Sequence, residues 1–205
     1  MTFDQLAADT SLNKTIESLK QKGYEVHSVE DKEKALEEII KIIPKDSSVM
    51  NGSSVTLEQI GFQNYLEKGD HGWINLHKKI TDQPDAEKRS KLRRESVLSD
   101  YYLGSVHALI EDGDYLVASN TGSQLPHVVF TSPNVIFVVS TKKIVKDLSA
   151  AFKRLEEYVI PLEDDHMQGL YGMNTTLNKI VISKGESPMI GRKIHFILVK
   201  ENLGF

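Results

Sequence analysis

The chain has 205 residues, with 25 Lys and Arg against 29 Asp and Glu, and a formal net charge of −4. This acidic balance argues against a nucleic-acid-binding surface. The absence of cysteine excludes disulfides and any thiolate-held zinc or iron–sulfur site within the chain. No run approaches the ~20 apolar residues of a membrane span, so we expect a cytoplasmic protein that does not contact a membrane.

The first segment of the chain predicts two helices around a short strand. Apolar residues recur at helical spacing over 3–22 and again over 31–43, with Pro44 ending the second helix. Residues 24–29 between them favour a strand. We therefore interpret 1–205 as a single α/β domain, in which 1–45 is an N-terminal helical and strand extension and 46–205 is the main sheet domain.

Residues 47–61 predict a strand, a small polar loop and a helix that continues to Leu66. Gly52 allows the backbone to approach a bound group closely. The free N–H groups and the dipole of a new helix favour an anion. An ordinary strand-to-helix turn also needs a glycine and a cap, so both interpretations stay open. The ligand-binding candidates in this loop are Asn51, Gly52, Ser53, Ser54 and Thr56.

The middle of the chain predicts a basic helix followed by a hairpin. The basic side chains of the helix over 85–97 are interrupted by glutamates, which favours a solvated face, although one of its arginines can reach an anionic ligand. Asp112-Gly113 between two apolar runs is a hairpin signal. A second small polar loop follows the hairpin, and its candidates are Asn120, Thr121, Gly122 and Ser123.

The last third predicts a central strand over 134–140, apolar throughout and thus covered on both faces. An amphipathic helix is expected over 143–158, a stretch of low periodicity over 162–178, and two closing strands. The alternation of strands and helices predicts a three-layer α/β/α fold with a mixed, mainly parallel sheet. Ligands in such folds bind beyond the carboxyl ends of the strands. If their strands are neighbours, the two polar loops face one pocket.

Five segments together resemble the LUD-domain family of lactate utilisation proteins over most of the chain. They are 51–61 (NGSSVTLEQIG), 100–114 (DYYLGSVHALIEDGD), Asn120-Thr121-Gly122, 138–145 (VVSTKKIV) and 194–205 (IHFILVKENLGF). The resemblance implies a fold like that of glucosamine-phosphate deaminase, ribose-phosphate isomerase and the CoA transferases. It also implies a role in oxidising L-lactate to pyruvate beside partner proteins that carry iron–sulfur clusters.

Two departures from the family pattern bear on the ligand. Many relatives have a cysteine-rich stretch before the closing strands, whereas 162–178 has no cysteine, so we expect any iron–sulfur cluster only on partner proteins. Many relatives also place an arginine just after the Thr-Gly loop, where this chain has Gln124. The substrate therefore need not be lactate itself.

Two functions follow from these observations. The first is an accessory or ligand-binding subunit that holds a small carboxylate or phosphate between the two loops. The second is a stand-alone enzyme of the sugar-phosphate isomerase or CoA-transferase type, which needs a general base. Candidates for that base are Asp112, Asp114 and Glu58, and further candidates are Glu111 and His166. A structural role in the hairpin turn explains Asp112 and Asp114 equally well. No metal site is expected. Tyr101, Tyr102 and Phe130 fit the core or, alternatively, a homodimer interface.

Overall fold

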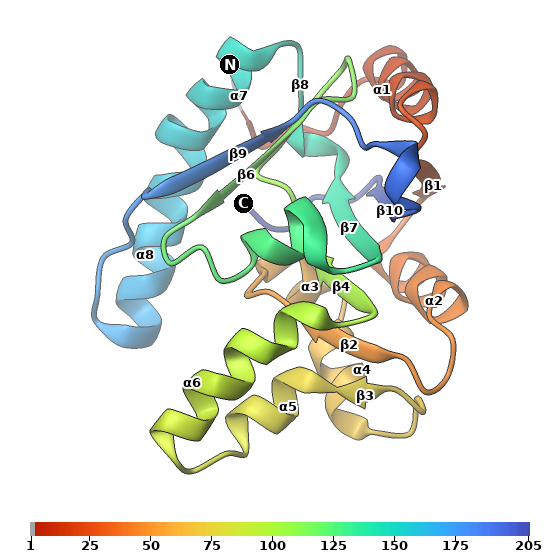
Figure 1. The fold of residues 1–205 in the computed structure, drawn as a ribbon. Helices are drawn as coiled ribbons and strands as arrows, with labels where there is room; N and C mark the ends of the chain where they lie inside the picture. Colours follow the sequence, from red (N-terminus) through yellow and green to blue (C-terminus); the bar gives the residue numbers. More distant parts are fainter. Residues whose placement is uncertain (1–2) are drawn as a thin grey trace.

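The main sheet has six strands, and every pairing within it is parallel. A computed structural model describes residues 3–205 (Figure 1), so Met1 and Thr2 of the predicted extension lie outside the described residues. The strand order is β1 (Glu25–Val29), β10 (Lys193–Val199), β7 (Asn134–Ser140), β4 (Tyr101–Gly104), β2 (Ser48–Asn51) and β3 (Ile74–Asn75). The segment 1–45 thus contributes an edge strand, β1, to this sheet.

A second, four-stranded sheet carries the predicted hairpin. Its order is β8 (Ile144–Val145), β5 (Ala108–Ile110), β6 (Tyr115–Ser119) and β9 (Lys179–Ser183). Strands β5 and β6 are antiparallel, as are β6 and β9, and Gly113 in the turn adopts a left-handed φ of 86°. The antiparallel pairs that we expected inside one mixed sheet therefore belong to a separate sheet.

Eight α-helices are described in residues 3–205, and five of them begin with a side-chain cap. The helices are α1 (Asp9–Gln21), α2 (Lys32–Ile42), α3 (Val55–Gln59), α4 (Phe62–Lys68), α5 (Leu76–Thr81), α6 (Ala86–Glu95), α7 (Leu148–Arg154) and α8 (Ile160–Tyr171). The caps are Asp31, Ser54, Asn75, Asp85 and Asp147, each accepting a backbone N–H of the first turn. Such caps satisfy N–H groups that have no partner within the helix.

Side chains of β7 alternate between two hydrophobic cores, which is why the strand reads as one apolar run. Val135, Phe137 and Val139 point to the face covered by α1 and the second sheet. Ile136 and Val138 point to the face covered by α2, α3 and α4. A third core joins the far face of the second sheet to α7 and the start of α8 (Figure 1). The predicted three-layer α/β/α fold with a mainly parallel sheet is confirmed.

Two predicted helices have different bounds in the structure. The helix expected to run on to Leu66 is broken into α3 and α4, because Gly61 adopts a left-handed φ of 76°. The helix expected over 143–158 begins only at Leu148, after β8, and then continues to Tyr171. Pro161 does not stop it, because proline is tolerated in the first turn of α8, which follows the wider π turn Leu155–Val159. The stretch 162–178 is therefore largely helical.

Candidate functional site

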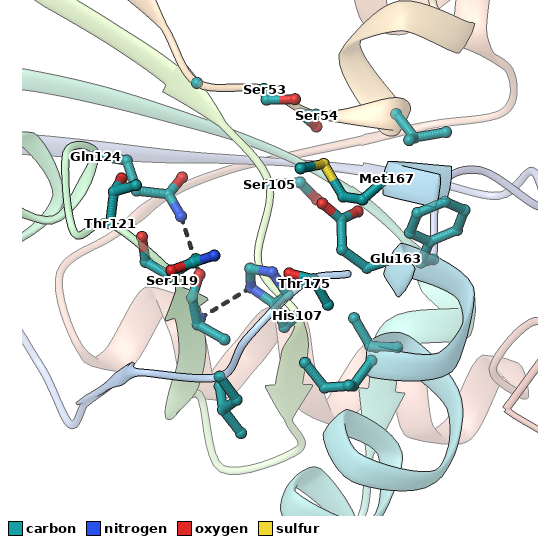
Figure 2. Close-up of a pocket in the computed structure, with 18 of the residues that line it drawn as sticks. Ser53, Ser54, Ser105, His107, Ser119, Thr121, Gln124, Glu163, Met167 and Thr175 are labelled. Carbon is teal, nitrogen blue, oxygen red and sulfur yellow. Dashed lines mark hydrogen bonds between the residues drawn. The ribbon is translucent and has the colours of Figure 1, made fainter. Parts of the chain in front are cut away.

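A cavity of about 510 Å³ lies where three neighbouring strands of the main sheet end. The segments that follow the carboxyl ends of β2, β4 and β7 line it, and the second sheet, α8 and Phe205 complete its walls (Figure 2). This is the position at which open α/β sheets bind ligands.

The first predicted loop forms one wall of the cavity. Ser54 caps α3, its Oγ accepting the backbone N–H of Leu57 at 3.3 Å. Gly52 is required there, because a Cβ at this position would lie 2.4 Å from the Tyr102 hydroxyl. The helix dipole that we invoked contributes little, since α3 has only 5 residues.

The second predicted loop faces the first across the cavity (Figure 2). Gly122 adopts a left-handed φ of 86°, and its N–H donates to Ser119 Oγ at 2.9 Å. Gln124 joins β6 to β4, because its Nε2 donates to the Ala118 carbonyl at 2.9 Å while its Oε1 accepts the Tyr102 hydroxyl at 3.2 Å. Gln124 therefore braces the cavity wall between these two strands.

The structure brings seven of the nine predicted binding residues to this cavity, namely Gly52, Ser53, Ser54, Thr56, Asn120, Thr121 and Ser123. Gly122 shapes its loop without lining the cavity. Asn51 is buried and lines a smaller cavity with residues of α4 and α5. Whether the seven bind a ligand stays a prediction.

The predicted general bases do not line the cavity. Asp112 accepts the backbone N–H of Asp114 at 2.9 Å, as a hairpin residue does. Burial raises the pKa of Asp114, but hydrogen bonds from Lys22 and Lys184 outweigh it and hold the pKa below its ordinary value. Its carboxylate is thus ionised and paired at the hairpin, and Glu58 also lies outside the cavity lining.

Lys143, which the sequence analysis did not single out, reaches the cavity from the turn Thr141–Lys143 after β7. Its residue surface is 4% exposed, and Nζ donates to Thr56 Oγ1 and to Ser105 Oγ, each at 3.0 Å. Burial, Arg154 and Lys142, in that order, hold the pKa of Lys143 well below its ordinary value. The sequence signal that could have identified Lys143 is its position directly after the central strand β7.

His107 and Arg154 form a layer beside this amine. His107 Nδ1 accepts the Ala118 N–H at 3.0 Å (Figure 2), and burial, Lys143 and Arg154 lower the pKa of His107 to about 3. Arg154 is fully buried, and its Nη1 donates to the His107 carbonyl at 2.5 Å. Its Nε and Nη2 have no partner among residues 3–205. The cavity is thus backed by buried positive charge.

Two further charged side chains line the cavity. Arg93 reaches it from α6, so one arginine of the basic helix does face the predicted site. Glu163 points into the cavity from α8 (Figure 2), and burial raises its pKa. Burial disfavours the ionised form of Glu163, while Arg93 and the buried Arg154 bring positive charge to the site, which favours an anionic ligand.

The parallel sheet with helices on its face and the polar cavity beyond its carboxyl ends define an α/β protein of the class that holds ligands at that edge. The family model of the LUD domain matches residues 12–194. The chain therefore belongs to the LUD-domain family, a lactate-utilisation-associated group.

A solved structure shows the same fold. It is the crystal structure of a DUF162 family protein from Deinococcus radiodurans, which is 12% identical to this chain with a TM-score of 0.58. The match covers 95% of this chain and 99% of that one. A comparison with curated proteins found no match.

Within residues 3–205, no three His, Cys, Asp or Glu side chains are grouped so as to hold a metal ion. No helix in the same residues combines the length and apolar character needed to cross a membrane.

Proposed function

We propose that this chain binds a small organic acid, L-lactate or a related 2-hydroxy or 2-oxo acid, as an accessory subunit of the oxidation of that acid. The observation that carries the proposal is the meeting of the two hydroxyl-rich loops in one cavity that Arg93 lines and the buried Arg154 backs, where burial raises the pKa of Glu163. A bound carboxylate supplies the missing charge.

The hydroxyl groups of Ser53, Thr56 and Thr121 provide donors for that carboxylate, with the cations adding charge. Hydrogen bonds to a charged group contribute about 1.5–3 kcal/mol each. The cavity volume of about 510 Å³ exceeds what a three-carbon acid fills, which supports a larger acid as well as lactate. Iron–sulfur clusters belong, in this proposal, to partner proteins that carry the electrons.

Thermal unfolding with a panel of ligands tests the binding. The panel contains L-lactate, larger 2-hydroxy acids, sugar phosphates and CoA esters. A 2-hydroxy acid at a hundred times its Kd stabilises the folded chain by about 2.7 kcal/mol, which raises Tm by roughly 5–10 °C for a chain of this size. No shift with any acid would overturn the proposal.

Two neighbouring arginines provide a matched control. Arg93 lines the cavity, whereas Arg94 follows it on α6 and donates to Ser90 Oγ at 3.1 Å. We expect Arg93→Gln to weaken the stabilisation by the acid and Arg94→Gln to leave it unchanged. Equal losses in both variants would show that the effect is one of net charge and not of this site.

The accessory role has its own test. A tagged chain purified without oxygen is expected to bring down a partner, with iron and acid-labile sulfide in the eluate. Lactate-dependent reduction of a dye is then expected from the complex and not from the isolated chain. Turnover by the isolated chain, or an eluate without iron, would contradict the accessory role.

One observation favours an enzyme as the second candidate. Glu163 is the carboxyl group in the cavity whose pKa is raised, and a general base works best with a pKa near the operating pH. An isomerase or CoA-transferase of this kind would show turnover of a sugar phosphate or CoA ester by the chain alone. Loss of that turnover in Glu163→Gln, with ligand binding retained, would favour the enzyme.

A further inference from the structure

The amine of Lys143 is placed in the cavity wall as a nucleophile is, without the partners of a structural cation. Nζ contacts two hydroxyl oxygens, those of Thr56 and Ser105, each at 3.0 Å. Ser105 donates its own proton to the Val138 carbonyl at 2.7 Å, so its oxygen is oriented to accept from the amine. No ion pair to Nζ is formed by any carboxylate of residues 3–205.

The charges around Lys143 favour the free amine. Arg154, whose guanidinium stays protonated in proteins, and Lys142 are its charged neighbours, and both are positive. Burial disfavours the ammonium form further. A desolvated lysine beside other cations is a recognised way to make a nucleophilic amine at neutral pH.

The C-terminal segment leaves room at this amine. A Cβ at Gly204 would lie 2.1 Å from Thr56 Oγ1 and 3.0 Å from Lys143 Nζ. Because Gly204 has no side chain, the segment can pass close to Thr56 and Lys143, and Phe205 lines the cavity next to it.

We propose that Lys143 condenses with the carbonyl group of a 2-oxo acid bound in this cavity and holds it as an imine at Nζ. The inference rests on the proposed function, because the cavity must first bind the acid, and it adds the chemical class of the ligand. A 2-oxo acid carries its carbonyl carbon next to its carboxylate. When the carboxylate lies against the hydroxyls that flank Nζ, that carbon lies next to the amine.

The step needs no oxidant or reductant. The lone pair of Nζ forms a bond to the carbonyl carbon while the C=O π pair moves to oxygen, and one proton passes from nitrogen to oxygen to give the carbinolamine. The nitrogen lone pair then forms the second C–N bond, and the hydroxyl leaves with the remaining nitrogen proton as water. The Thr56 hydroxyl, in contact with Nζ, is placed to pass the proton between the two atoms.

Reductive trapping tests the imine. The purified full chain is incubated with pyruvate and sodium borohydride, and the product is analysed by intact mass and peptide mapping. We expect one adduct per chain, on Lys143, and none with L-lactate, which has no carbonyl carbon to attack. Trapping spread over exposed lysines such as Lys146, or no adduct at all, would overturn the proposal.

Lys142 gives the matched control, since it is adjacent in sequence and also buried. Lys143→Arg is expected to lose the adduct, and Lys142→Arg to keep it, with thermal unfolding confirming that both are folded. Should Lys143→Arg fail to fold, competition in the unaltered chain decides: excess L-lactate must suppress the pyruvate adduct. An adduct that L-lactate does not suppress lies outside the cavity and contradicts the imine.

The outcomes separate this inference from the function it rests on. If L-lactate stabilises the chain but pyruvate is not trapped, the imine is wrong and the binding function stands. If neither acid stabilises the chain and nothing is trapped, both are wrong.

Discussion

Lys142 and Lys143 are adjacent in sequence and similarly buried, yet their surroundings differ in kind. Nζ of Lys142 lies 2.6 Å from Asn202 Oδ1 and 3.4 Å from a carboxylate oxygen of Asp4. Nζ of Lys143 contacts two hydroxyls and opens on the cavity. A buried charge is ordinarily paired, as that of Lys142 is, so Lys142 has a structural role. Lys143 has no carboxylate partner among residues 3–205 and is held as the free amine, which marks the site.

The C-terminal segment produces much of this difference. Asn202 gives Lys142 an acceptor and also donates to Asp4 Oδ1 at 2.9 Å. Two residues later, Gly204 lies close to Lys143 but has no side chain with which to pair it. The difference between the two lysines can therefore be tested by substitutions around Lys142 and by substitutions around Lys143.

The largest effect is expected at Gly204. Its φ of 64° is left-handed, and a Cβ would collide with Thr56 Oγ1. We expect Gly204→Val to lower the free energy of unfolding by about 2–4 kcal/mol, from backbone strain and overpacking together, measured by urea denaturation. Gly185, where a Cβ meets nothing within 4 Å, is the control. A comparable loss in Gly185→Val would contradict the steric argument.

The pH dependence of stability should distinguish the two amines next. The pKa of Lys143 lies well below 10.5 in the folded chain because of burial and the neighbouring cations. Between that lowered pKa and 10.5, the unfolded chain binds a proton that the folded chain does not, so stability rises with pH in that window, by at most about 1.4 kcal/mol per pH unit.

Lys143→Met removes that dependence, whereas Lys142→Met should keep most of it. Burial also lowers the pKa of Lys142, but the hydrogen bond and charge of Asp4 partly offset this. Urea denaturation between about pH 7 and pH 9 checks the difference. Parallel curves for the unaltered chain and Lys143→Met would show that Lys143 is ionised in the folded state.

Substitutions of Lys142 and Lys143 should also differ in their effect on ligand affinity, by a smaller free energy than in the preceding tests. Lys143→Met is expected to weaken L-lactate binding roughly ten-fold, because one charge-assisted hydrogen bond is lost. Lys142→Met should leave the affinity unchanged, since its Nζ is occupied by Asn202 and Asp4. Isothermal titration calorimetry measures both, and a similar loss in each would erase the distinction.

The smallest effect is expected from a substitution of Asn202, the partner of Lys142. Asn202→Ala removes the acceptor at Lys142 and the donor at Asp4, and should cost about 1 kcal/mol of unfolding free energy. Affinity for L-lactate should not change. A loss of affinity in this variant would show that the Lys142 environment is part of the binding site.

The sequence was sufficient for the architecture and for two walls of the cavity. The apolar run over 134–140 and the polar loops after predicted strands depend on local patterns, so they could be read directly. Glu163 could not be placed, because its helix passes a proline that ordinarily ends one. Arg154 was hidden on the buried face of α7, where a charge without a carboxylate partner is not expected from sequence.

Lys143 was a different kind of omission. The same rule that located the loops, that ligands lie beyond strand ends, also applies to the turn after the most apolar strand. The sequence analysis instead placed Lys143 at the start of the amphipathic helix expected over 143–158. Only the packing of Thr56, Ser105 and Gly204 shows that one of them is buried against the cavity.

The place of β10 in the main sheet has a consequence for biosynthesis. This strand, Lys193–Val199, is inserted between β1 and β7, both of which leave the ribosome much earlier. Until it emerges, β1 has no neighbour in the sheet and the edge of β7 is open. The nascent chain therefore cannot complete its sheet until β10 has emerged, and the open edge of β7 stays exposed to edge-to-edge association until then.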